Sequence, residues 1–197
     1  MVVGVDLVKW QLLIASGEKL IIKQEELSQR GHAIECRIYA EDPENSFLPS
    51  PGKILYQKEP EGPGVRLDNG IFTGFEVTPY YDPILSKLIV WGENRDTAIK
   101  GMVNALDNYI ILGVKTTGSY LRELIQHPEF IKGNTCTDFI DKNMKDRKKI
   151  VDDDLIDLSL ITASFSDGNI KMKKGVSSDY ETISSPWESI GKWEIGS

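Results

Sequence analysis

The most informative residue for chemistry in this sequence is an arginine inside a regular strand pattern at residues 32–40. Small or apolar residues occupy every second position of that stretch: Ile34, Cys36, Ile38 and Ala40. Glu35 and Arg37 fall between them, and the two-residue period of a strand places both on the opposite, polar face. A planar guanidinium held there can bind a carboxylate, bicarbonate or a developing oxyanion, with Glu35 orienting it. The alternative from the pattern alone is a structural Glu35–Arg37 pair on a solvated face.

Two further charged residues stand beside predicted strands. Asp82 lies in a Tyr-Tyr-Asp-Pro segment just before an apolar strand pattern. It can orient an arginine from that position, or it can simply begin an Asp-Pro turn. Arg66 follows a glycine-rich loop at the start of a short strand pattern, where it is either a rim charge or an interface contact.

Familiar catalytic motifs are absent from the sequence. It has no P-loop, no dinucleotide-binding glycine motif after a strand, no nucleophile elbow and no paired-histidine metal motif. Two cysteines and two histidines make neither a disulfide framework nor a zinc site, so we expect no metal centre. Cys36 is expected to be inert packing on the core side. These absences disfavour a self-contained hydrolase.

Composition narrows the class of protein. The 197 residues include 23 basic and 30 acidic side chains, for a net charge of −7. An acidic balance argues against nucleic acid or an anionic membrane as a partner. No apolar run approaches the roughly 20 residues that a membrane span requires, and no signal peptide is recognisable. We therefore expect a soluble intracellular protein.

The predicted elements describe an α+β domain over residues 1–144, with a mostly antiparallel sheet and flanking helices. A helix at 5–16, apolar on most sides, is expected to be buried against more than one layer. Further strands are predicted at 53–57, 65–67, 71–77 and 84–91, the last being central, and further helices at 95–110, 117–126 and 138–144. Asp68-Asn69-Gly70 predicts a hairpin turn, and Gly101 is expected to permit close packing of its helix.

Composition shifts at residue 145. A charged junction follows, and we interpret 145–197 as an extended linker and the start of a truncated second module. Within it the pattern suggests a short helix at 155–165, a turn at 166–169 and a strand at 170–173.

Many ungapped blocks of this sequence closely resemble the C-terminal domain of biotin carboxylase, as found in acetyl-, propionyl- and methylcrotonyl-CoA carboxylases and pyruvate carboxylase. The blocks are GVDLV at 4–8, RGHAIECRIYAEDP at 30–43, FLPSPG at 47–52, YYDP at 80–83, KLI at 87–89 and GVKT at 113–116. They follow the order of the family over about residues 1–144, so the resemblance is specific.

The resemblance implies an ATP-dependent ligase. In that family ATP and bicarbonate carboxylate N1 of carrier-bound biotin, and the arginine of the Glu-Cys-Arg segment lies beside biotin and bicarbonate. That role carries over to Arg37 as the catalytic, biotin- and bicarbonate-binding residue. Glu35 becomes a supporting residue behind it, Asp82 becomes either a supporting residue or a subunit contact, and Arg66 becomes a dimer-interface residue. ATP and Mg²⁺ or Mn²⁺ are bound mainly by an N-terminal part that these residues do not include, so the chain alone is expected to be inactive.

The implied partners are the ATP-grasp part of the same chain, a biotin carboxyl carrier domain, a second copy in a homodimer and a carboxyltransferase subunit. The tryptophan-bearing junction near Trp187 and Trp193 favours propionyl-CoA as the final substrate. The expected location is the cytoplasm, or the mitochondrial matrix in a eukaryote. The main alternative is a non-catalytic docking module whose sheet and tail only organise neighbouring domains. A related ATP-grasp ligase of purine synthesis is disfavoured, because it lacks the Glu-Cys-Arg and Tyr-Tyr-Asp blocks.

Overall fold

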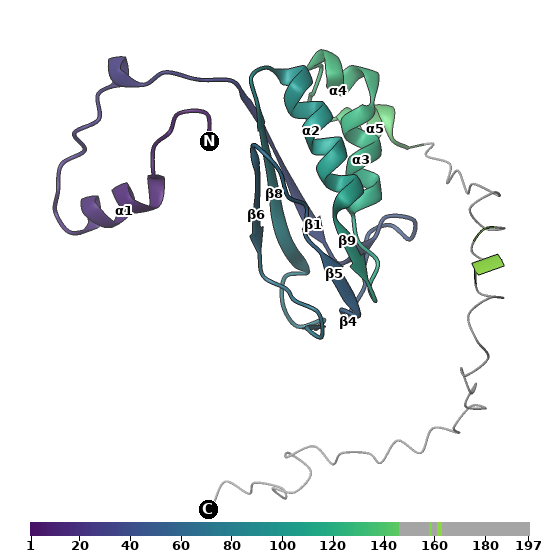
Figure 1. Ribbon diagram of the computed structural model, residues 1–197. Helices are drawn as coiled ribbons and strands as arrows, with labels where there is room; N and C mark the ends of the chain where they lie inside the picture. The colour runs from purple at the N-terminus through teal and green to yellow at the C-terminus, as the bar shows by residue number, and fades with distance from the viewer. Residues whose placement is uncertain (146–157, 159–160, 163–197) are drawn as a thin grey trace, which may run out of the picture. The chain divides into compact units, whose positions relative to one another are not determined.

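The computed structural model describes residues 1–145 together with 158, 161 and 162, and the first of the chain's two units spans Met1–Asp146 (Figure 1). The helices are α1 (Leu7–Ala15), the 3₁₀ turn η1 (Gln24–Glu26), α2 (Arg95–Asn108), α3 (Gly118–Gln126), α4 (Pro128–Lys132) and α5 (Phe139–Asn143). The strands are β1 (His32–Tyr39), β2 (Glu41–Asp42), β3 (Leu48–Pro49), β4 (Gly52–Lys53), β5 (Tyr56–Lys58), β6 (Val65–Asn69), β7 (Glu76–Val77), β8 (Ile84–Gly92) and β9 (Ile110–Leu112).

The main sheet has three antiparallel strands in the order β1-β8-β6. Strand β8 is central, as its apolar run predicted. The smaller pairs β2-β3, β4-β7 and β5-β9 are also antiparallel. This arrangement, with helices beside the sheet, confirms the predicted α+β class.

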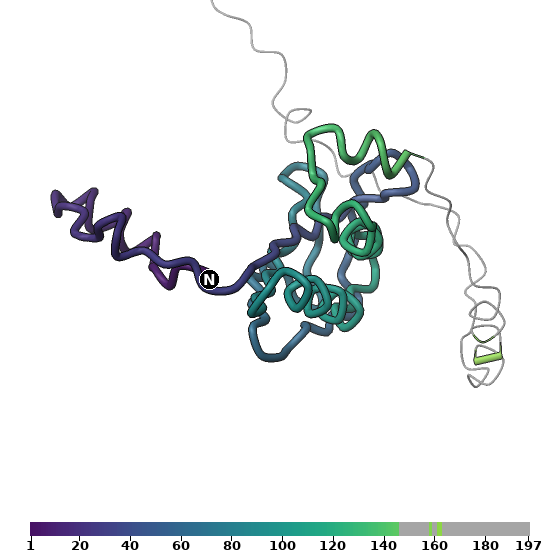
Figure 2. The backbone as a smooth tube through the Cα atoms, turned by 90° about the horizontal axis from the view of Figure 1, so that it is seen from above, coloured from purple at the N-terminus to yellow at the C-terminus, as the bar shows by residue number. Residues whose placement is uncertain are grey.

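Helices α2 and α3 lie side by side against one face of this sheet (Figures 1 and 2). The core between them is built from alternate residues of β1 and β8 and from one stripe of each helix: Ile34, Cys36, Ile38, Leu88, Val90, Ile99, Met102, Leu106 and Ile125. Asn94 begins α2 by accepting a hydrogen bond from the Thr97 amide at 2.9 Å, which satisfies one of the helix's first amides. Since one face of β1 and β8 is packed against helices, their other side chains must face outward.

Helix α1 differs from its prediction. It forms close to the expected bounds and Asp6 caps it through the Lys9 amide at 2.9 Å. None of its residues is buried, however, so the expectation of a helix enclosed by several layers is wrong for the described part of the chain. The apolar pattern shows that the helix has apolar side chains on most sides, but it does not show which other part of the protein packs against them.

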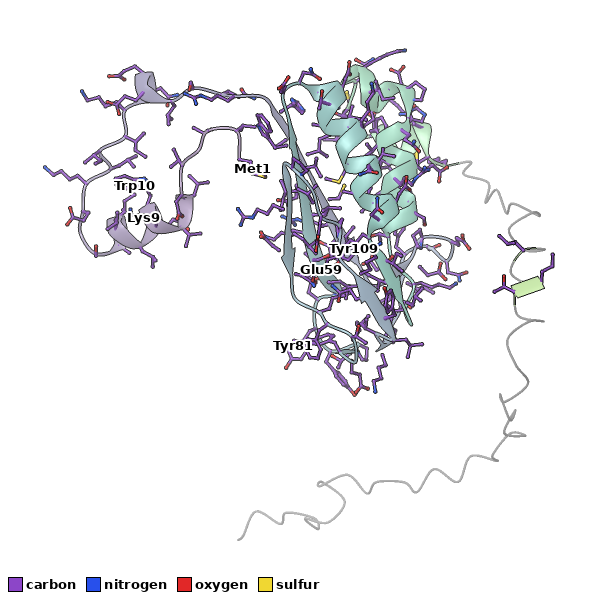
Figure 3. All side chains as sticks on the ribbon, viewed as in Figure 1. Met1, Lys9, Trp10, Glu59, Tyr81 and Tyr109 are labelled. Carbon is purple, nitrogen blue, oxygen red and sulfur yellow. The ribbon has the colours of Figure 1, made fainter. Side chains whose placement is uncertain are left out.

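The predicted hairpin at Asp68-Asn69-Gly70 is also wrong. Asp68 and Asn69 end strand β6, which pairs with β8 further along the chain, and Gly70 does not adopt a positive φ. The side-chain amide of Asn69 donates instead to the carboxylate of Glu59 at 2.6 Å and to the backbone carbonyl of Ile71 at 2.9 Å (Glu59 is labelled in Figure 3). Long-range pairing overrides the local turn preference here.

Several element boundaries shift. The segment predicted as one strand at 53–57 forms parts of β4 and β5, and only Glu76–Val77 of the segment 71–77 is a strand. Pro128 occupies the first turn of α4, where its missing amide costs nothing. The helix, turn and strand predicted at 155–173 lie outside the described residues, apart from 158, 161 and 162. The predicted domain boundary at 144 and 145 stays a prediction.

Gly101 permits the close approach of α2 to β8, as expected. A Cβ added there would meet Cγ1 of buried Val90 at 2.9 Å. Because valine is β-branched, Val90 has few alternative rotamers that would move its methyl group away from an added Cβ.

We predict that Gly101→Ala destabilises the domain by about 1 kcal/mol, because overpacking at ~1–3 kcal/mol outweighs the ~1 kcal/mol gain in helix propensity. Urea denaturation of Gly101→Ala, Val90→Ala and the double variant measures this. The double variant should lose at least about 1 kcal/mol less than the sum of the single variants. Strictly additive losses would contradict the proposed contact.

A buried carboxylate holds the loop after β1. Asp42, with only 10% of its side chain exposed, accepts hydrogen bonds from Lys115 Nζ at 2.5 Å and Asn45 Nδ2 at 2.7 Å. The ammonium of Lys115 is the main cause that lowers the pKa of Asp42. Hydrogen bonds from the side-chain amide of Asn45 and the backbone amide of Glu44 lower it further. The same loop is held a second time, because the Lys115 amide donates to Ser50 Oγ at 3.0 Å.

We predict that Asp42 stabilises the domain in a pH-dependent way. Its folded pKa lies below the unfolded value of about 3.9, so its contribution is fully present above that pH and is lost as the pH falls through the folded pKa. Urea titrations should show Asp42→Asn losing more stability at pH 7 than at pH 3. The control Ser50→Ala removes an uncharged contact in the same loop, so its loss should not change with pH. A loss for Asp42→Asn that is equal at both pH values would contradict the prediction.

Candidate functional site

The outward face of the main sheet carries two rows of side chains, one residue from each strand. Arg37 of β1 lies opposite Lys87 of β8, and Lys87 lies opposite Asp68 of β6. In the next row Glu35 lies opposite Ile89, and Ile89 lies opposite Arg66. We call the five charged residues of these two rows, Glu35, Arg37, Arg66, Asp68 and Lys87, the charged face.

Arg37 projects from this face into solvent, with 62% of its side chain exposed. Its Nε lies 3.4 Å from Oε1 of Glu35, so the structure brings together the two residues predicted from the strand pattern. The hydroxyl of Tyr39 and then the carboxylate of Glu35 raise the pKa of Arg37. The guanidinium is therefore a permanent cation on a rigid strand.

A second ion pair borders the first. Arg66 binds Asp68 through two nitrogens, with Nε to Oδ1 at 2.8 Å and Nη2 to Oδ2 at 3.2 Å. Lys87 Nζ lies 3.5 Å from the same Asp68 carboxylate. Arg66 is the main cause that lowers the pKa of Asp68, and Lys87 adds to it, so the carboxylate is charged near neutral pH.

Asp82 occupies the turn that leads into β8. Its Oδ1 accepts the amide of Ile84 at 2.9 Å, which is the turn-forming alternative considered from the sequence. Tyr81, the residue before it, lies at one end of the sheet (Figure 3). Among the hydrogen bonds and ion pairs of residues 1–145, none joins Asp82 to Arg37. A supporting role for Asp82 stays a prediction, as does the interface role of Arg66.

Sequence reasoning missed Lys87 and Asp68. A signal for Lys87 was present, because it is the one charged residue of the apolar strand β8. Its position beside Arg37 depends on the pairing register of β1 and β8, which no local pattern specifies. Cys36, by contrast, is buried as predicted, and burial followed by the charge of Glu35 raises the pKa of its thiol to about 12.

Within residues 1–145, no group of three or more His, Cys, Asp and Glu side chains converges as a metal site would require. The helices of the described part of the chain are too short or too polar to cross a membrane.

A protein-family model described as biotin carboxylase C-terminal domain matches residues 35–142, which include the whole charged face. The chain belongs to this family. The charged face is thus part of a biotin carboxylase C-terminal domain, and the resemblance carried by the Glu-Cys-Arg block is confirmed.

Full-length relatives extend well beyond this domain. The chain is 46% identical over 157 residues to a pyruvate carboxylase subunit of Methanothermobacter thermautotrophicus, covering 78% of this chain and 32% of the relative. It is 38% identical over 200 residues to the alpha chain of mitochondrial methylcrotonoyl-CoA carboxylase of Dictyostelium discoideum, covering 99% of this chain and 28% of the relative. The chain therefore spans less than a third of the length of either relative.

A solved structure gives the same result for the fold. The biotin carboxylase domain dimer of Hydrogenobacter thermophilus 2-oxoglutarate carboxylase, in complex with MgADP, ADP and bicarbonate, matches with a TM-score of 0.72 and 41% identity. The match covers 76% of this chain and 33% of that one.

Proposed function

We propose that this chain is the C-terminal part of a biotin carboxylase, which uses ATP and bicarbonate to carboxylate N1 of carrier-bound biotin. The observation that carries the proposal is an exposed arginine on a rigid strand, within the Glu-Cys-Arg block of a biotin carboxylase C-terminal domain. Relatives over most of the chain are named as subunits of biotin-dependent carboxylases.

In this proposal Arg37 acts where negative charge develops. Biotin, when bound, would supply a ureido nitrogen that accepts the carboxyl group and gives its proton to the phosphate released from ATP, and negative charge would develop on the ureido oxygen. A guanidinium already fixed in place stabilises that charge without reorganising, which is the most effective form of electrostatic catalysis. The free donors of a planar guanidinium also suit bicarbonate. Glu35 limits the rotation of the side chain by its contact with Nε.

The residues present do not fit ATP or a metal ion. The sequence holds no phosphate-binding loop, and residues 1–145 hold no converging set of carboxylates. We therefore propose that ATP and Mg²⁺ or Mn²⁺ bind to another part of the full-length protein, which corresponds to the two-thirds of the relative's length that this chain does not span.

The further partners we propose are the ATP-grasp part of the same protein, a biotin carboxyl carrier domain, a carboxyltransferase subunit, and a second copy of the protein with Arg66 at the dimer interface. We propose the cytoplasm or, in a eukaryote, the mitochondrial matrix as the location.

For the final substrate we propose an acyl-CoA. The relative whose match covers 99% of this chain is named as part of a methylcrotonoyl-CoA carboxylase. That favours a methylcrotonoyl-type acyl-CoA over the propionyl-CoA suggested by the tryptophan-bearing junction.

We predict that Arg37→Ala in the full-length protein lowers the rate of bicarbonate-dependent biotin carboxylation by about 10²–10³-fold, the usual loss for one donor to a developing oxyanion. The rate is measured as ADP released during the carboxylation of free biotin. Arg122→Ala is a matched control, since Arg122 forms an exposed ion pair with Asp107 on the helices. Both variants should keep the unfolding midpoint of the wild type. If Arg37→Ala retains activity within a few-fold, Arg37 is structural and the docking-module alternative is favoured.

The 197-residue chain by itself should release no ADP from ATP, with or without bicarbonate and biotin. We expect this because the groups that bind nucleotide and metal lie elsewhere in the full protein. A coupled ADP assay with the full-length protein as the positive control tests it. Bicarbonate-dependent ADP release by the chain alone would contradict the proposed division of labour.

A further inference from the structure

We propose that helix α4 is a pH-sensitive element, which two unprotonated histidines hold at its two ends and which opens when they take up protons. The chain contains two histidines, His32 and His127. One accepts a hydrogen bond from the first turn of α4, and the other accepts one from the arginine that binds the last turn. Histidine is the side chain whose charge ordinarily changes between pH 5 and pH 8. The proposal goes beyond the proposed function, because it concerns the packing of the helices and involves no substrate.

His127 holds the beginning of α4. Its Nδ1 lies 3.3 Å from the backbone nitrogen of Glu129, and a backbone amide can only donate, so Nδ1 must accept. This contact satisfies one of the first amides of the helix, which have no partner within it. An imidazolium has no nitrogen left to accept a hydrogen bond, and its positive charge is unfavourable at a helix N-terminus. Protonation of His127 therefore removes the cap.

Arg95, the first residue of α2, holds the other end of α4. Its Nη2 donates to the carbonyl of Phe130 at 2.6 Å, and its Nε donates to the carbonyl of Ile131 at 3.4 Å. The guanidinium carbon also lies 4.9 Å from the centre of the Phe130 ring, within the range of a cation–π contact. Carbonyls in the last turn of a helix lack partners within the helix, so Arg95 stabilises this end.

His32, the first residue of β1, keeps Arg95 in place. Nη1 of Arg95 lies 3.0 Å from Nε2 of His32. A guanidinium only donates hydrogen bonds, so this Nε2 is the acceptor and carries no proton. Protonation of His32 would replace the hydrogen bond by two adjacent cations, which repel each other. We expect Arg95 to move away from His32 and to weaken its contacts with the carbonyls of α4.

The two ends of α4 are connected to helix α5 through aromatic rings. The imidazole of His127 and the ring of Phe130 each pack edge-on against buried Phe139, with ring centroids 5.5 Å and 6.5 Å apart. Phe139 forms a small core cluster with Tyr120 of α3 and Met144. Release of α4 would remove both ring contacts of Phe139, so we expect α4 and α5 to open together.

The charges around the histidines determine the direction of the pH effect. Arg95 opposes protonation of His32. Glu129 favours protonation of His127, but Lys132 already binds its carboxylate at 2.8 Å. None of the ion pairs within residues 1–145 joins a carboxylate to either histidine. The other charged residues near them in the chain or beside Phe139 are Arg30, Glu93, Asp96, Glu123, Asp138 and Lys142.

These contacts require the unprotonated form of both histidines. The opened segment therefore binds more protons than the closed one over the ordinary titration range of histidine, near pH 6.5. It follows that the stability of α4 is fully present above this range and decreases as the pH falls through it.

Hydrogen exchange of the full-length protein, followed by mass spectrometry at about pH 7.5 and pH 5.5, tests this on both sides of the histidine range. Rates are corrected for the pH dependence of intrinsic exchange. The amides of Ile131, Gly133 and Asn134 report on α4, and those of Lys142 and Met144 report on α5, because all five are hydrogen-bonded in the closed state. At the lower pH their opening should increase about fivefold or more, the equilibrium equivalent of one lost helix cap. The buried amides of α2 should keep their protection.

Two substitutions remove the titration and keep an acceptor at each position. Asparagine is a good N-cap residue, so His127→Asn should hold the start of α4 at both pH values. The side-chain oxygen of His32→Gln can accept from Arg95. The double variant should therefore show the same corrected exchange at both pH values. Arg122→Ala is the matched control, since it breaks an exposed ion pair with Asp107 and should keep the pH response of the wild type.

Two results would overturn the proposal. One is a wild-type protein whose corrected exchange in α4 is equal at both pH values. The other is a double variant that retains the wild-type pH response, because groups other than the histidines would then control the opening. General acid unfolding would expose α2 to the same extent as α4 and would persist in the double variant, so it counts against the proposal too. None of these measurements needs turnover, so the result does not depend on the proposed activity.

Discussion

The charged face depends on one constraint, the pairing register of β1 with β8. Side chains of a strand alternate between its two faces, so a shift of one residue would exchange the faces completely. It would bring Glu35, Arg37 or Lys87 toward α2 and α3 and expose Cys36, Leu88 and the other core residues. Burying an unpaired charge costs several kcal/mol, and uncovering the apolar set loses about 1.5–3 kcal/mol for each large side chain. The hydrophobic core therefore determines where the arginine points.

The same constraint explains why charges can gather on this face. Repulsion between the facing cations Arg37 and Lys87 would weaken a sheet that had no other support. Here the helices hold β1 and β8 from the opposite side, and Gly101 allows α2 to approach Val90 closely. The repulsion is partly offset by Glu35 and Asp68, each within 3.5 Å of one cation. Exposed pairs of this kind contribute little to stability.

Much of this arrangement could be predicted from the sequence, because it follows from short-range periodicity. The alternation from Ile34 to Ala40 identified both faces of β1, and the unbroken apolar run identified β8 as central. The predictions that were wrong concern residues whose contacts lie far away in the sequence. Asp68-Asn69-Gly70 has the composition of a turn, yet β6 pairs with β8 and Asn69 binds Glu59. The cover of α1 and the position of Lys87 beside Arg37 likewise depend on surfaces and registers that no single segment encodes.

Two levels of sequence information thus locate the site. Periodicity places Arg37 on an exposed face, and the block from Arg30 to Pro43 gives that position a chemical meaning by family resemblance. Neither kind of information predicts which residue of the neighbouring strand lies opposite Arg37. Only the three-stranded register shows that Arg37 faces a second cation whose carboxylate partner is shared with Arg66. An electrostatic site on a sheet is a property of rows that cross the strands, whereas sequence patterns run along them. The residues most easily missed are therefore those directly opposite a recognised one, and in this domain that residue is Lys87.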